Sequence, residues 1–133
     1  MDRPRVVVLA DDLIWQTRLV GTLREIGAEP KTTAVAARFE AQLTSADAAI
    51  VDLTSLRYDP IAALTAAGAR GVPTLAVGQH DDADARRSAL DAGARRVFAY
   101  RKLFEDGPRT LASWLASCGF ELPARPAAVA GHE

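Results

Sequence analysis

The sequence predicts one doubly wound α/β domain, in which helices cover both faces of a parallel sheet. Two observations carry this prediction. Five strand-like runs alternate with five helix-like segments along the chain, and the better runs are almost wholly aliphatic. Aliphatic runs are typical of parallel strands buried on both faces, and the alternation favours right-handed crossovers. At 133 residues, the chain is long enough for one domain with a proper core.

In the first half of the chain, the strand-like runs are residues 5–10, 29–33 and 47–53. The second run is weak because it contains Pro30 and few apolar side chains, and a proline inside a sheet indicates an edge strand. Apolar residues at helical spacing predict the two helices between these runs, with Trp15, Leu19, Leu23 and Ile26 marking residues 13–26, and Val35, Phe39 and Leu43 marking the second helix.

The second half continues the alternation, with strands at residues 73–78 and 95–100 and helices at residues 60–67 and 82–92. In the last helix one apolar stripe includes Trp114, and Pro108 lies near the expected start. Five strands and five helices fit the flavodoxin-like order 2-1-3-4-5, which puts the weak second strand at an edge. We expect the domain to span residues 1–121 and residues 122–133 to form a flexible tail or linker stub.

Composition excludes several classes of protein. Hydrophobic residues make up 49% and the formal net charge is −1, so no global field recruits nucleic acid or membrane. The single cysteine, Cys118, excludes an intrachain disulfide. No apolar run approaches the roughly 20 residues of a membrane span, and the N-terminus leads directly into a strand without a signal peptide. The expected location is the cytoplasm.

Acidic residues follow two of the strand-like runs. Asp11 and Asp12 close the first run, and Asp52 closes the third. In the order 2-1-3-4-5 these strands are neighbours, so their carboxyl ends converge at one edge of the sheet. Three carboxylates there suit a hard cation such as Mg²⁺, and one of them could act as a nucleophile. The simpler alternatives are a helix cap at Asp11 or Asp12 and a turn at Asp52.

Four motifs define a resemblance: Ala10-Asp11-Asp12, Asp52, Val72-Pro73 and Ala92-Gly93-Ala94. With these, the chain resembles the receiver domain of bacterial response regulators over about residues 5–119. The resemblance implies a Mg²⁺ site in which Asp12 is the main ligand, supported by Asp11, by Asp52 and by the backbone carbonyl of Thr54. It also implies that Asp52 accepts a phosphoryl group from a histidine kinase.

Three switch positions depart from the pattern of that family. The family's hydroxyl residue, five residues after the proline, falls on Gly78, its aromatic residue on Val97, and its lysine on Tyr100. A phenol can donate a hydrogen bond to a carboxylate but cannot neutralise it near pH 7, because it titrates near 10. Lys102 would be a substitute cation if the strand continued past Tyr100, since alternate residues share a side. The simpler alternative is a solvated loop lysine.

Residues 86–109 form a basic segment, which contains seven basic and three acidic residues and carries a net charge of +4. By the resemblance, this region includes a face used for dimers and output partners. We therefore expect it to dock an acidic surface of a partner protein or to form a homodimer, although a solvated basic face is the simpler alternative. No recognition-helix motif or run of stacking aromatics accompanies it, so we do not expect nucleic-acid binding.

The leading hypothesis is an atypical receiver, or pseudo-receiver, in two-component or phosphorelay signal transduction. It would act through protein–protein contacts with an impaired phosphoryl switch, and not as an enzyme. The alternative is a functional Mg²⁺-dependent phosphoacceptor that uses Asp52. A third hypothesis, an unrelated flavodoxin-like enzyme with metal-assisted chemistry, ranks last. The chain has no phosphate-binding glycine loop, nucleophile elbow or cofactor fingerprint.

Overall fold

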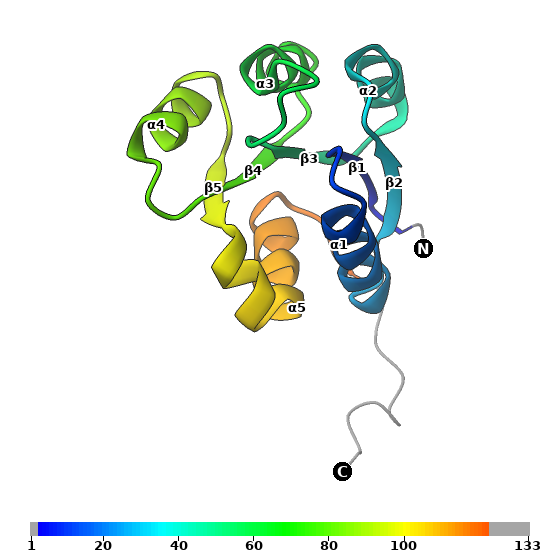
Figure 1. Ribbon diagram of the computed structural model, residues 1–133. Helices are drawn as coiled ribbons and strands as arrows, with labels where there is room; N and C mark the ends of the chain where they lie inside the picture. The colour runs from blue at the N-terminus through cyan, green and yellow to red at the C-terminus, as the bar shows by residue number, and fades with distance from the viewer. Residues whose placement is uncertain (1–2, 123–133) are drawn as a thin grey trace.

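The computed structural model describes residues 3–122 and contains one parallel five-stranded sheet in the order β2-β1-β3-β4-β5. The elements follow one another as β1 (Arg5–Leu9), α1 (Leu13–Glu25), β2 (Glu29–Thr33), α2 (Ala36–Gln42), the short 3₁₀ helix η1 (Leu43–Ser45), β3 (Ala48–Asp52), α3 (Pro60–Ala69), β4 (Thr74–Gly78), α4 (Ala83–Asp91), β5 (Arg96–Ala99) and α5 (Tyr100–Ser117). Helices α2, α3 and α4 cover one face, and α1 and α5 the other (Figure 1). The predicted flavodoxin-like doubly wound fold is confirmed.

Burial explains the order of the strands. Every residue of β3 and β4 is buried, as expected for central strands with a helical layer on each face. The weak strand β2 lies at the edge, where its Pro30 is in register with Val6 of β1. A proline has no N–H to donate, so an edge is the place in a sheet that tolerates it.

Alternate residues of each strand enter two separate hydrophobic cores. Val6 and Val8 face α1 and α5, where Trp114 is the largest fully buried side chain. Val7 and Leu9 face the helices on the other side of the sheet. Because period-two packing fixes both faces, the register of the strands is fixed too. The residues that follow β1 and β3 are therefore held at defined positions along the carboxyl edge.

The sequence prediction is wrong for the junction between β5 and α5. The strand ends at Ala99 instead of residue 100, and the helix begins at Tyr100 instead of near Pro108. Asp106 has non-helical angles (φ −147°, ψ 46°), so α5 consists of two helical segments joined at a kink. Pro108 lacks the N–H that a continuous helix would need and its ring crowds the preceding turn, which accounts for the kink. The strand does not continue from Tyr100 to Lys102, which was the condition for Lys102 to act as a substitute cation.

The predicted domain boundary at residue 121 stays a prediction. Leu122, the last described residue, packs against the core formed with α1 and α5, and the rest of the predicted tail lies outside the described residues. Between residues 3 and 122, no helix is long and apolar enough to cross a membrane.

Candidate functional site

The carboxyl ends of β1 and β3 lie side by side at the edge of the sheet. Leu9 is in register with Val51, so Asp11 follows one strand next to the point where Asp52 ends the other. Asp52 is the last residue of β3 and is only 1% exposed. A buried carboxylate has to find hydrogen-bond donors to offset the loss of water. The contacts of Asp52 therefore define what this site can do.

One oxygen of Asp52 accepts hydrogen bonds from three donors. The backbone N–H of Thr54 lies 2.9 Å from Oδ1 and the Thr54 hydroxyl 2.8 Å from it, and the Tyr100 hydroxyl donates to the same atom. The two hydroxyl oxygens are 2.7 Å apart, because they share this acceptor. Each hydroxyl has a single proton, so both protons are used when both groups donate to Asp52. We call Asp52, Thr54 and Tyr100 the hydroxyl triad.

Tyr100 is held in the triad from the side of α1. Its ring makes an edge-on contact with Trp15, with 4.5 Å between centroids and 87° between ring planes. Burial raises the pKa of the Tyr100 phenol well above its ordinary value, and the hydrogen bond to Asp52 raises it further. The phenol is therefore a neutral donor at any physiological pH. It donates a hydrogen bond to Asp52 but carries no positive charge.

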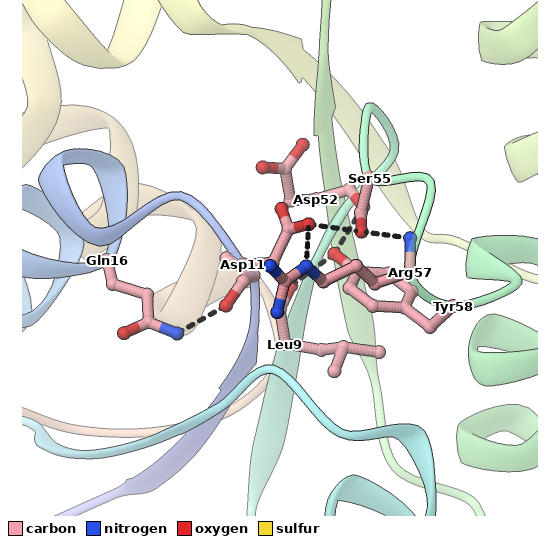
Figure 2. Close-up of polar contacts among 8 residues, drawn as sticks. Leu9, Asp11, Gln16, Asp52, Ser55, Arg57 and Tyr58 are labelled. Atoms are coloured by element: carbon pink, nitrogen blue, oxygen red, sulfur yellow. Dashed lines mark hydrogen bonds and ion pairs between the residues drawn. The ribbon is translucent and has the colours of Figure 1, made fainter.

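Asp11 has a different set of partners (Figure 2). Its Oδ2 accepts from the Ser55 hydroxyl at 2.9 Å and lies 3.7 Å from Nε of Arg57. The Ser55 hydroxyl also accepts from the Arg57 backbone N–H at 2.9 Å, so Ser55 connects Asp11 to the loop that follows β3. The Arg57 side chain is 76% exposed, and an exposed ion pair of this kind contributes little to stability.

Asp12 forms the N-cap of α1, the simpler of the two roles that the sequence leaves open for it. Its Oδ1 accepts from the backbone N–H of Trp15 at 3.0 Å. The backbone of Asp12 is extended, as expected for a residue that precedes the first helical turn. This bond offsets one of the unpaired N–H groups at the start of α1.

Tyr58 joins the two strand ends, and the sequence analysis missed it. Its buried hydroxyl lies 3.0 Å from the Leu9 carbonyl and 2.7 Å from the Asp52 carbonyl. Burial raises the pKa of this phenol, and the charges of Asp52 and Asp11 raise it further. The available signal was an aromatic residue with a polar tip, Tyr58, in the loop that follows β3. Such residues usually find a partner when buried.

The acidic residues are not gathered into a ready-made Mg²⁺ site in this arrangement, although each of Asp11, Asp12 and Asp52 uses only one carboxylate oxygen in the hydrogen bonds described above. Among residues 3–122, no group of three or more His, Cys, Asp or Glu side chains is placed to hold a metal ion. Asp12 caps a helix, Asp11 is bonded to Ser55, and Asp52 is bonded within the hydroxyl triad. The expected metal role of the Thr54 carbonyl stays a prediction. In the structure, Thr54 acts through its N–H and its hydroxyl.

The remaining switch positions lie on β4, β5 and α5. Gly78 ends β4 and is buried, and a Cβ atom built on it would lie 3.3 Å from Cδ1 of Leu53. Val97 is buried on β5. Lys102 is exposed in the first turn of α5, with its Nζ 5.9 Å from the centre of the Phe98 ring. Lys102 thus lies over an aromatic ring, and no contact within the described chain joins it to the carboxylates.

The basic segment spreads its charges over α4, β5 and α5. Arg101 lies 3.5 Å from Glu105 and Arg109 lies 3.9 Å from Asp106, and all four of these side chains are largely exposed. Arg96 lies over the ring of Phe98 at 5.0 Å. The segment is therefore partly neutralised by its own acidic residues and remains solvated.

Comparisons with known proteins place this geometry in context. No protein-family model and no curated protein sequence matches the chain. Solved structures do match it. A response regulator receiver protein from Burkholderia phymatum is 27% identical, with a TM-score of 0.74, over 92% of this chain and 100% of that one.

Two further matches are receiver domains of lower identity. The receiver domain of TorR, the response regulator of a TMAO respiratory system, is 19% identical with a TM-score of 0.77, over 86% of this chain and 98% of that one. A CheY-like receiver domain from Methanospirillum hungatei JF-1 is 18% identical with a TM-score of 0.69, over 87% of this chain and 99% of that one. At such identities the likeness establishes the fold, and the chemistry has to be argued from the site.

Proposed function

The chain folds as a response-regulator receiver domain, and from this premise we propose that it acts in two-component or phosphorelay-type signal transduction as an atypical receiver. Its phosphoryl switch is impaired, and it works in the cytoplasm as a protein-binding module and not as an enzyme. The observation that carries this proposal is the hydroxyl triad, in which Tyr100 and Thr54 both donate to Oδ1 of Asp52.

The triad impairs phosphoryl transfer in two ways. First, three hydrogen bonds to Oδ1 stabilise the charged Asp52 carboxylate and withdraw electron density from both of its oxygens, so the carboxylate is a weaker nucleophile. Second, a transferred phosphoryl group brings negative charge that needs cationic or charge-assisted partners. Tyr100 offers a neutral phenol, and Gly78 offers no side chain. A phosphorylated state therefore gains few contacts that the unphosphorylated state lacks, and a small difference shifts little population.

With an impaired phosphoryl switch, signal transfer depends on contacts between this domain and a partner protein. We place them on the basic segment, residues 86–109, which suits an acidic surface of a partner protein or a second copy of this chain. Arg87 and Arg95 support this choice, because both are exposed and neither side chain has an ion-pair partner among the described residues. Charged side chains without internal partners are available to steer association.

The alternative, a working phosphoacceptor on Asp52, is favoured by the placement of Asp52 and Asp11 on adjacent strand ends. In that case a histidine kinase would be the partner, and Mg²⁺ would bind through the oxygens of Asp11, Asp12 and Asp52 that the present hydrogen bonds leave free. The metal would supply the charge that offsets the phosphoryl oxygens.

Labelling with acetyl phosphate and MgCl₂, followed by intact-protein mass spectrometry, separates the two candidates. We expect weak labelling of the parent protein and stronger labelling of Tyr100→Lys, which supplies the missing cation. Tyr100→Phe is the matched control, because it removes the hydroxyl without adding charge, and it should label less than Tyr100→Lys. Strong labelling of the parent that is lost in Asp52→Asn, together with a change of oligomeric state, would favour the working phosphoacceptor.

A further inference from the structure

A cleft of about 360 Å³ lies beside the hydroxyl triad, between α4 and the loops that follow β3 and β4. Its lining combines apolar side chains, among them Leu53, Ala85 and Val97, with polar and charged ones, and Gly78 contributes no side chain that would fill it. The polar and charged lining residues are Thr54, Ser55, Gln79, His80, Asp82 and Arg86. This volume lies within the range of small-molecule sites, roughly 300–1,000 Å³.

Two oppositely charged residues that line the cleft do not pair with each other. Asp82 and Arg86 are four residues apart at the start of α4, a spacing at which oppositely charged side chains commonly interact. No ion pair joins them in the described part of the chain. Arg86 instead donates from Nη1 to the Val97 carbonyl at 3.1 Å, and Asp82 accepts from the Ala85 N–H at 3.0 Å.

These two hydrogen bonds hold the side chains of Arg86 and Asp82 in place and leave each with further atoms that are free to bond to a ligand. A guanidinium group has five N–H donors, and the bond to Val97 uses one nitrogen. A carboxylate has two oxygens, and the cap uses Oδ1 of Asp82. The lining of the cleft therefore includes a positive and a negative residue about one helical turn apart along α4, together with apolar side chains.

We propose that this cleft binds a small zwitterion with an apolar body, of the class of the apolar α-amino acids. The carboxylate of the ligand bonds to Arg86, its ammonium group bonds to Asp82, and its side chain covers Val97 and Leu53. A simple anion would lose the contact with Asp82 and meet its negative charge. Binding requires no phosphoryl transfer, so this proposal is independent of the function proposed for Asp52.

Isothermal titration calorimetry with three probes tests the choice of ligand class. Phenylalanine carries both charges, phenylacetate only the negative one and phenethylamine only the positive one. We expect phenylalanine to bind at least about ten-fold more tightly than either of the others, the effect of one charge-assisted hydrogen bond. The proposal is overturned if phenylalanine does not bind at millimolar concentration, or if phenylacetate binds equally well.

Variants of α4 locate the site. Arg86→Gln removes the charge, and Ala85→Leu fills the cleft from the helix. Each should weaken phenylalanine binding at least about ten-fold. The matched controls are Arg87→Gln and Ala83→Leu, the same changes at exposed residues of α4 that do not line the cleft. They should leave binding within about two-fold, as surface changes usually do. Equal loss in variants and controls would place binding elsewhere and refute the site.

Discussion

The two halves of the carboxyl edge of the sheet are built differently. On the β1 and β3 side, Tyr58 bridges the Leu9 and Asp52 carbonyls and Ser55 holds Asp11, so side chains join neighbouring segments directly. On the β4 and β5 side, β4 ends at Gly78, and within residues 3–122 Tyr100 is the one side chain of this half that bonds to Asp52. One half is a bonded network around the two strand ends, whereas the other bonds to Asp52 through Tyr100 alone, next to an open cleft.

This difference shows how a buried carboxylate can persist without a cation. Asp52 is 1% exposed and has no lysine or arginine partner among the described ion pairs. Hydrogen bonds to the charged form stabilise it in place of an opposite charge. The donors come from one backbone N–H and two hydroxyls. Asp52 thus acts as a structural acceptor that ties α5 to β3, and substitutions can measure the strength of that role.

The largest expected effect is that of Asp52→Ala. It leaves the donors of Thr54 and Tyr100 without their acceptor, and we expect a loss of about 2–4 kcal/mol in the free energy of unfolding. Urea denaturation gives the value. Asp52→Asn is the control, since it retains an oxygen acceptor and should lose less. If Asp52→Ala were as stable as the parent, repulsion among the carboxylates would outweigh the hydrogen bonds and the structural role would be wrong.

Alkaline pH should lower the free energy of unfolding through both halves of the carboxyl edge. Each half contains one tyrosine with a raised pKa, Tyr58 in the first and Tyr100 in the second. The folded state then holds the phenol protons more tightly than the unfolded chain does. The stabilisation from these two phenols is therefore fully present below their unfolded pKa of about 10. Above that pH the free energy of unfolding falls, by about 1.4 kcal/mol per pH unit for each phenol. Urea denaturation between pH 8 and pH 11 measures this slope.

The chain has two tyrosines, Tyr58 and Tyr100, so tyrosinate absorbance reports on this edge of the sheet alone. In an alkaline titration the absorbance should rise together with loss of the circular dichroism signal. Tyr58→Phe should remove about half of the pH dependence of stability. A tyrosinate signal near pH 10 from the fully folded parent would contradict the raised pKa values.

The doubly wound fold and its strand order could be predicted from the sequence because local signals agreed with the global fold. The aliphatic runs of β1, β3 and β4 and the proline of β2 each favour one position in the sheet. The start of α5 could not be predicted in this way. Pro108 is a common first helical residue, and residues 95–100 alternate acceptably as a strand. The kink at Asp106 lets the helix begin before the proline.

The sequence pointed to the acidic residues of the site and, through the family resemblance, to Tyr100 as a possible hydrogen-bond donor to a carboxylate. Asp11, Asp12 and Asp52 follow strands, and the strand order alone brings two strand ends together. The partners of these residues come from loops and from a helix start, where no periodic pattern exists. The Tyr100 hydroxyl reaches Asp52 from the first residue of α5. The position of the Tyr58 hydroxyl depends on the path of the loop after β3. Contacts between distant segments leave no local signal.

Removing one tyrosine hydroxyl should cost less free energy of unfolding than Asp52→Ala, and it distinguishes the two halves of the carboxyl edge. Tyr58→Phe removes a buried hydroxyl from two backbone carbonyls, and we expect a loss of about 1–3 kcal/mol in the free energy of unfolding. Tyr100→Phe removes one donor of three from Asp52 and should lose about 1 kcal/mol. Thermal and urea denaturation of both variants give the comparison. A larger loss from Tyr100→Phe would mean that the β4 and β5 half, and not the bonded network, holds the edge together.

The smallest expected effect is at Asp12, where a helix cap and a metal ligand make opposite predictions. As a cap, Asp12 offsets the Trp15 N–H, so Asp12→Ala should lose about 1 kcal/mol in the free energy of unfolding. Asp12→Asn should stay close to the parent, because Asn caps helices about as well as Asp. A metal ligand would behave differently, since anything that binds only the folded state stabilises it by mass action. Melting curves in chelator and in millimolar MgCl₂ decide between the two roles. A Mg²⁺-dependent rise in the parent melting temperature that Asp12→Asn abolishes would show that Asp12 leaves the cap to bind the metal.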